Sequence, residues 1–170
     1  RVGTVGRVHP HLEIKIVDEN GKVVPRGKLG ELCVRGYSVM LGYWEDNDKT
    51  QEVIDVAKWM HTGDIAEMDE EGFVKIKGRI KDVVIRGGEN LFPKEIEDFL
   101  YTHPDVSDVQ VIGLPDPRYG EELCACIILH EHQQINEEAI RQYCAEHISH
   151  NKVPRYVRFF TEFPMTASGK

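Results

Sequence analysis

The feature that most limits the fold of this chain is a change in hydrophobic periodicity near residue 78. Before it, apolar and charged side chains alternate, as in residues 11–17, which is the pattern of half-buried strands. After it, short apolar runs are interleaved with residues spaced three and four apart, as in Ile96, Phe99 and Leu100, which form one face of a helix. The sequence therefore predicts an α+β fold with a β-rich first part and a mixed second part.

The first part is expected to consist of strands joined by turns that are rich in glycine. Asn20–Gly21 is a hairpin turn signal after the first strand. The expected strands are residues 11–17, 30–36, 59–68 and 72–78. A short helix is expected at 46–54, with Asp46 or Asp48 as its N-cap.

The second part is expected to form a short sheet with two covering helices, after a junction at residues 79–82. Pro93 suits the first turn of one helix, which His103–Pro104 would end. Asn136 is the expected N-cap of the other helix. The inner face of this second helix is expected to contain Ile140, Tyr143, Cys144 and Ile148. Strands are expected at 106–114, 123–129 and 156–160, with a turn at 115–122.

Charge and hydropathy exclude several classes of protein. The 170 residues contain 21 Lys and Arg against 29 Asp and Glu, a net charge of −8, which argues against nucleic acid as the main partner. No apolar run approaches the length of a transmembrane helix. Arg1 opens directly into a strand-like pattern, so no signal peptide is expected, and the chain has the character of a fragment of a longer protein.

The four cysteines, Cys33, Cys124, Cys126 and Cys144, match no paired zinc-binding spacing. We expect them to be small buried residues in a reducing compartment, and we predict no metal site.

Three short stretches contain residues that could bind a ligand with hydroxyl and phosphate groups. Asp64 in "HTGD" could accept hydrogen bonds from vicinal hydroxyls, and Arg79 could bind ribose or phosphate oxygens. Gly87–Gly88 would let a ligand approach the backbone, and Lys170 could neutralise a phosphate or carboxylate. Taken alone, each stretch is better explained as an ordinary turn or a solvated tail.

Taken together, these stretches have the order and separation of a known family. The run "WMHTGD", the run "GFVKIKGRIKDVVIRGGENLFPKEIE" and the terminal "PMTASGK" resemble the adenylate-forming superfamily of acyl-CoA synthetases, aryl-CoA ligases, luciferases and adenylation domains. The resemblance extends over essentially the whole chain. The runs "RGYSVMLGYW" and "ISHNKVPRYVRF" are most similar to fatty acyl-CoA ligases of the medium-chain group.

The resemblance implies an architecture and a reaction. Residues 1–80 would be the β-rich, distorted barrel-like end of a large AMP-binding domain, and residues 81–170 a small mobile C-terminal domain. A carboxylate would react with ATP, which enters with Mg²⁺, to give acyl-adenylate and pyrophosphate. CoA would then take the acyl group as a thioester and release AMP. Rotation of the small domain would supply different groups for the two steps.

The resemblance also implies roles for individual residues. Asp64 and Arg79 would bind the ribose and phosphate of ATP or AMP, and Lys81 would be the hinge. The CoA-binding turn would comprise Gly87, Gly88 and Glu89. Lys170 would be the catalytic lysine that bridges the substrate carboxylate and the α-phosphate during adenylation.

One departure from the family concerns the phosphate contacts. Asn90 stands where some relatives carry Arg. Arg118, Lys152 and Arg155 are alternative phosphate-binding candidates, and solvated surface charge is an equally good interpretation of each.

Two other functions stay open. The parent chain could charge a carrier protein instead of free CoA, or it could be a non-catalytic binding module of the same fold. For the ligase we expect small-molecule substrates (ATP, a fatty or other carboxylic acid, and CoA) and an intracellular, cytoplasmic location, or the mitochondrial matrix in a eukaryote. The fragment alone is expected to be inactive.

Overall fold

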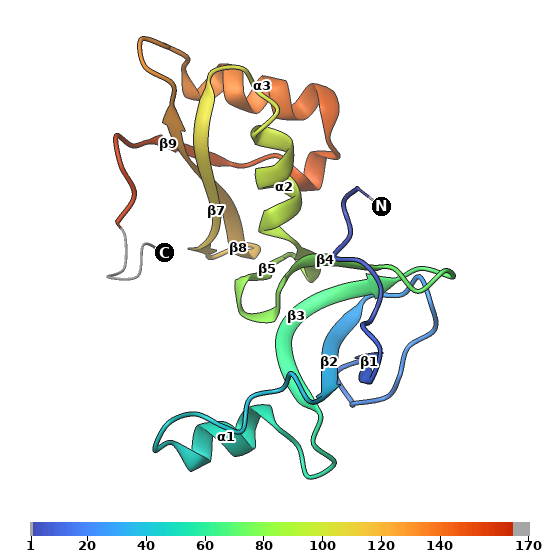
Figure 1. The fold of residues 1–170 in the computed structure, drawn as a ribbon. Helices are drawn as coiled ribbons and strands as arrows, with labels where there is room; N and C mark the ends of the chain where they lie inside the picture. Colours follow the sequence, from blue (N-terminus) through green and yellow to red (C-terminus); the bar gives the residue numbers. More distant parts are fainter. Residues whose placement is uncertain (1, 165–170) are drawn as a thin grey trace. The chain divides into compact units, whose positions relative to one another are not determined.

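The computed structural model describes residues 2–164, which divide into two compact units with the boundary between Lys81 and Asp82 (Figure 1). Each unit has its own β-sheet, and each contains at least one α-helix. The predicted α+β class is therefore confirmed.

The first unit is built on one antiparallel sheet with the strand order β1-β2-β3-β4. Its elements are β1 (Leu12–Val17), β2 (Gly30–Gly36), α1 (Asn47–Val53), β3 (Met60–Met68) and β4 (Val74–Arg79). The small core of this unit contains Ile16, Ala66 and Val74. Of the two predicted N-caps, Asp46 is the cap of α1, because its side chain accepts a hydrogen bond from the Lys49 amide.

The second unit begins inside the 3-10 turn η1 (Ile80–Asp82), and its sheet runs β6-β5-β8-β7, with β9 parallel to β8. Its elements are β5 (Val84–Arg86), β6 (Glu89–Leu91), α2 (Pro93–Leu100), β7 (Val106–Asp116), β8 (Gly120–Leu129), α3 (Glu137–His147), the 3-10 turn η2 (His150–Lys152) and β9 (Tyr156–Phe159).

Both helices of the second unit contribute to a single core. Ile96 of α2 and Ile140 of α3 are fully buried in the same cluster as Leu123 and Ile127 of β8. Figure 1 shows α2 and α3 beside the long hairpin β7–β8. The spacing of apolar residues in the sequence predicted both buried helix faces, because that spacing places them on one side of each helix.

Three local expectations were wrong. The turn expected at 115–122 is confined to residues 117–119, because β7 extends to Asp116 and β8 begins at Gly120. Ile148 lies beyond the last turn of α3, as its C-cap, although it still packs against the core. The strand β6 was not expected at all. The first and third errors have the same cause, which is pairing between strands that local turn propensity does not report.

No helix within the described residues combines the length and apolar character that crossing a membrane would require.

The four cysteines are free thiols. All four were expected to be buried, and this is confirmed for three of them, whereas Cys126 is half-buried. Burial raises the pKa of Cys33, Cys124 and Cys144 to about 11. Only about one in a thousand of these thiols is ionised at pH 8. We therefore expect iodoacetamide at pH 8 to modify the half-buried Cys126 first and the other three only after unfolding, as peptide mass spectrometry over time would measure. Alkylation of Cys144 at the rate of Cys126 in the folded protein would contradict this.

Candidate functional site

The structure brings together Asp64 and Arg79, which the sequence places in separate motifs. The antiparallel pairing of β3 and β4 sets these two residues opposite each other. The Nε atom of Arg79 lies 3.3 Å from Oδ1 of Asp64, and the Arg79 side chain is 60% exposed. An ion pair this exposed adds little to stability, so both groups can turn to a ligand at small cost.

The strand that carries Asp64 is irregular at this point. Glu31 pairs with Ile65 and Cys33 pairs with His61, so residues 62–64 of β3 stand opposite the single residue Leu32 of β2. Gly63 within this bulge has a φ of +71°, a backbone conformation that side chains with a Cβ rarely adopt. Bulges of this kind bend a strand and redirect its side chains, and here the redirected side chain is Asp64.

Side chains bind the backbone groups of the bulge. Oε1 of Glu31 accepts a hydrogen bond from the Gly63 amide at 3.0 Å. Thr62 Oγ1 accepts one from the Asp64 amide at 3.1 Å and donates one to the Leu32 carbonyl at 2.7 Å. The conformation around Asp64 is thus set by hydrogen bonds from outside the regular ladder. Sequence reasoning missed Glu31, although it is a carboxylate on a strand that pairs with the "HTGD" strand.

Glu31 also belongs to a group with Cys33 and His61, whose potential ligand atoms all lie within 4.8 Å of one another. Nδ1 of His61 is 2.7 Å from Oε2 of Glu31 and 3.6 Å from Sγ of Cys33. A carboxylate can only accept, so Nδ1 carries the hydrogen and is not available as a ligand. Burial, with Glu31 nearby, raises the pKa of Cys33 to about 11, so this side chain is a neutral thiol beside the His61–Glu31 pair. The group is best described as a hydrogen-bonded cluster.

The predicted CoA-binding turn lies in the second unit, between β5 and β6. Gly87 and Gly88 have φ values of +59° and +85°, the arrangement of a two-residue hairpin turn. The Gly87 amide donates to the Tyr119 carbonyl at 2.8 Å. A Cβ on Gly88 would meet nothing within 4 Å, so the backbone there is open on one side. Turn geometry alone is enough to require both glycines, and the open side of Gly88 is compatible with a ligand.

Glu89 connects this turn to a distant segment. Its Oε2 accepts a hydrogen bond from Nδ2 of Asn151 in η2, at 2.8 Å. The neighbouring Arg86 donates through Nε to Glu122 at 2.7 Å and through Nη1 to the Asn151 carbonyl at 3.3 Å. The glycine turn is therefore held at both ends by charged side chains. Glu122, which is 1% exposed, was missed because it falls within the stretch expected to be a turn.

The hinge candidate Lys81 is exposed and lies in η1, directly before the boundary between the two units. Its position agrees with the role that the resemblance implies, and the role itself stays a prediction.

The three alternative phosphate-binding residues differ in their availability. Nζ of Lys152 is 2.6 Å from Glu95, and Nη1 of Arg155 is 3.1 Å from Asp116. Arg118 has no ion pair within the described residues, and its guanidinium lies 5.0 Å from the centre of the Tyr119 ring. Arg118 is thus the best placed of the three to meet an added anion.

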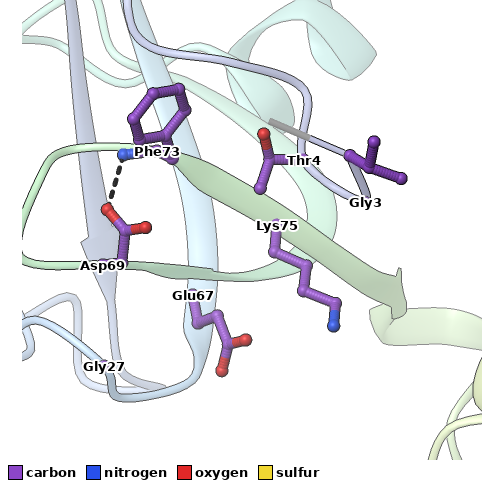
Figure 2. Close-up of a pocket in the computed structure, with 8 residues that line it drawn as sticks. Gly3, Thr4, Gly27, Glu67, Asp69, Phe73 and Lys75 are labelled. Atoms are coloured by element: carbon purple, nitrogen blue, oxygen red, sulfur yellow. Dashed lines mark hydrogen bonds between the residues drawn. The ribbon is translucent and has the colours of Figure 1, made fainter.

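A separate hollow of about 390 Å³ lies in the first unit and contains none of the predicted site residues (Figure 2). Its lining includes Thr4, Glu67, Phe73 and Lys75. The Phe73 amide, at one edge, donates to Asp69 Oδ1 at 2.9 Å. The acidic and basic side chains around it give no single charge preference.

The catalytic candidate Lys170 falls outside the described residues, so its role is not addressed by the geometry.

Two family models match the chain. The model described as "AMP-binding enzyme C-terminal domain" matches residues 95–170, and the one described as "AMP-binding enzyme" matches residues 1–44. A mitochondrial medium-chain acyl-CoA ligase from Bos taurus is 55% identical over 168 residues, which are 98% of this chain and 27% of that protein. The putative acyl-CoA synthetase YngI from Bacillus subtilis (strain 168) is 52% identical in an alignment of 171 positions, which covers 100% of this chain and 31% of that protein.

Solved structures also match this chain over nearly its whole length. The o-succinylbenzoate CoA synthetase of Bacillus subtilis, in complex with its acyl-adenylate intermediate, matches with a TM-score of 0.92 and 31% identity over 100% of this chain and 34% of that one. ATP-bound MatB from Rhodopseudomonas palustris matches with a TM-score of 0.90 and 35% identity, over 98% of this chain and 33% of the MatB chain. The chain spans about a third or less of the length of each of these four proteins.

Proposed function

Because the chain belongs to the AMP-binding enzyme family, as part of its C-terminal portion, we propose that it is the C-terminal part of an AMP-forming fatty acyl-CoA synthetase. The observation that carries the proposal is the Asp64–Arg79 pair. It places an acceptor for ribose hydroxyls beside a donor for phosphate oxygens, on adjacent strands, in a chain of a nucleotide-binding family.

Each half-reaction uses different groups of the chain. In the first, Asp64 binds the ribose of ATP, and Arg79 binds the ribose or phosphate. Lys170 lowers the charge repulsion between the substrate carboxylate and the α-phosphate as the carboxylate approaches the α-phosphorus. In the second, the second unit turns about Lys81 and brings Gly87, Gly88 and Glu89 to the thiol arm of CoA. Mg²⁺ enters as the complex with ATP.

The wider architecture is part of the same proposal. Residues 1–80 form the β-rich, distorted barrel-like end of the large AMP-binding domain, and residues 81–170 form the small mobile domain. The fatty-acid substrate is suggested by the names of the relatives, which include a medium-chain acyl-CoA ligase. An intracellular location, in the cytoplasm or mitochondrial matrix, is compatible with the free buried thiols.

The test uses the full-length chain that contains this sequence. We expect pyrophosphate exchange into ATP that depends on an added fatty acid, followed by an acyl-CoA product identified by mass when CoA is supplied. Acyl transfer to a holo-carrier protein but not to CoA would favour the alternative of an adenylation domain. Absence of both ATP binding and adenylate would favour a non-catalytic module.

A further inference from the structure

We infer that Glu31 is a positioning residue, which fixes the bulge of β3 so that the Asp64 carboxylate faces Arg79 and the nucleotide. The inference rests on the proposed role of Asp64 in binding the ribose. It assigns a function to a carboxylate that neither the motif pattern nor the family comparison points to.

The first step of the argument is the position of Glu31 in the ladder. Glu31 is the last residue of β2 to pair with β3 in register before the bulge at residues 62–64. Its side chain reaches across the bulge, and its Oε1 accepts the hydrogen bond of the Gly63 amide. A donor displaced from the regular ladder is thereby paired by a charged acceptor, the stronger class of hydrogen bond.

The second step is that Glu31 itself is held. Its Oε2 is 2.7 Å from Nδ1 of His61, and its side chain is only 19% exposed. Both oxygens are therefore engaged, one at each end of the "HTG" segment. A carboxylate fixed at two points restricts the peptide between them far more than a single exposed contact would.

The third step connects the bulge to Asp64. The Asp64 amide is bonded to Thr62 Oγ1, and the Asp64 carboxylate lies 3.3 Å from Arg79. A second irregularity, between Ile65 and Ala66 in the β3–β4 ladder, follows directly. Asp64 therefore lies inside the first break and close before the second, so the β3–β4 pairing with Arg79 supports it on one side and no regular pairing with β2 supports it on the other. The hydrogen bond that the Gly63 amide donates to Glu31 adds support on the β2 side, one residue away.

The experiment measures how well the full-length enzyme discriminates ATP from 2′-deoxy-ATP, as the ratio of kcat/KM in pyrophosphate exchange. A carboxylate held against the ribose hydroxyls should favour ATP by about a hundredfold, because removing one hydroxyl leaves its acceptor unpaired. We expect Glu31→Ala to reduce this ratio about tenfold, with KM for the fatty acid unchanged within about twofold. Glu31→Gln keeps an acceptor for the Gly63 amide and should restore most of the discrimination.

Asp64→Ala should lose the same discrimination, and adding Glu31→Ala to it should change the ratio little, because the two residues act on one interaction. The matched control is Glu13→Ala, which removes a carboxylate of the same sheet that binds Arg35 instead. It should leave the ratio at its wild-type value.

The outcomes separate this inference from the proposed function. If Asp64→Ala loses the ribose discrimination and Glu31→Ala keeps it, Glu31 does not position Asp64 and the inference is wrong. An equal fall in activity toward both nucleotides on Glu31→Ala would likewise assign Glu31 a purely structural role. If the wild-type enzyme forms no adenylate, or does not discriminate, the proposed function or the role of Asp64 is wrong, and the inference falls with it.

Discussion

Replacing Lys170 with alanine in the full-length chain should slow acyl-adenylate formation by about two orders of magnitude or more, and should largely spare thioester formation from preformed acyl-adenylate. The substrate carboxylate and the α-phosphate are both anions, and negative charge grows on the phosphoryl oxygens as they react. A cation between them lowers the energy of that arrangement, and it has no such task when a thiol attacks the acyl carbonyl.

Pyrophosphate exchange measures the first half-reaction, and rapid mixing of synthetic acyl-adenylate with CoA measures the second. Lys28→Ala is a suitable control, because Lys28 is an exposed lysine in a turn of the first unit and has no assigned role. If Lys170→Ala slowed both half-reactions by the same factor, the lysine would not be specific to adenylation and the assignment would be wrong.

The sequence predicted well those features that depend on neighbouring residues. The alternation at 11–17 corresponds to β1, and the short run between glycines at 30–36 corresponds to β2. Asp46 and Asn136 are the N-caps of the helices that they were expected to begin. Each of these signals lies within a few residues of the structure it specifies, because caps and side-chain periodicity are local properties.

The features that the sequence did not predict depend on partners far along the chain. Pro115 and Asp116 have the composition of a turn, yet they belong to β7 because the ladder with β8 continues through them, pairing Pro115 with Glu121. The three residues of β6 are too few to show alternation, and they are a strand only because Val84 pairs with Leu91 across the Gly87–Gly88 turn. Non-local pairing overrides local propensity in both places.

The candidate site divides in the same way. Motif order placed Asp64 and Arg79 in one site, and the strand register then set them opposite each other. Glu31 and Glu122 could not be predicted from their neighbours, because what distinguishes each is a partner about thirty residues or more away. A carboxylate on a strand gives no sign in the sequence of whether it faces solvent or a distant amide.

Glu122→Ala should lower the free energy of opening of the second unit by about 3 kcal/mol, which is the largest effect on stability that we predict. Glu122 is 1% exposed, and it lies 2.7 Å from Nε of Arg86 and 3.5 Å from Nη1 of Arg155. Its removal leaves the guanidinium of Arg86, which is only 19% exposed, without a carboxylate. An unpaired charge in that position costs more than the lost contact itself.

Native-state hydrogen exchange of the β8 amides measures this free energy for the second unit alone. Tryptophan fluorescence would report on the first unit instead, because both tryptophans lie there. Glu122→Gln should cost about half as much, and adding Arg86→Met to Glu122→Ala should recover most of the loss, because no unpaired charge remains. Asp98→Ala, which removes an exposed partner of Lys94 on α2, should change the opening free energy by no more than about 0.5 kcal/mol. A Glu122→Ala change as small as that of Asp98→Ala would mean that Arg86 finds water or another acceptor at no cost. The Gly87–Gly88 turn, which Arg86 adjoins, would then be held by Asn151 and Tyr119 instead.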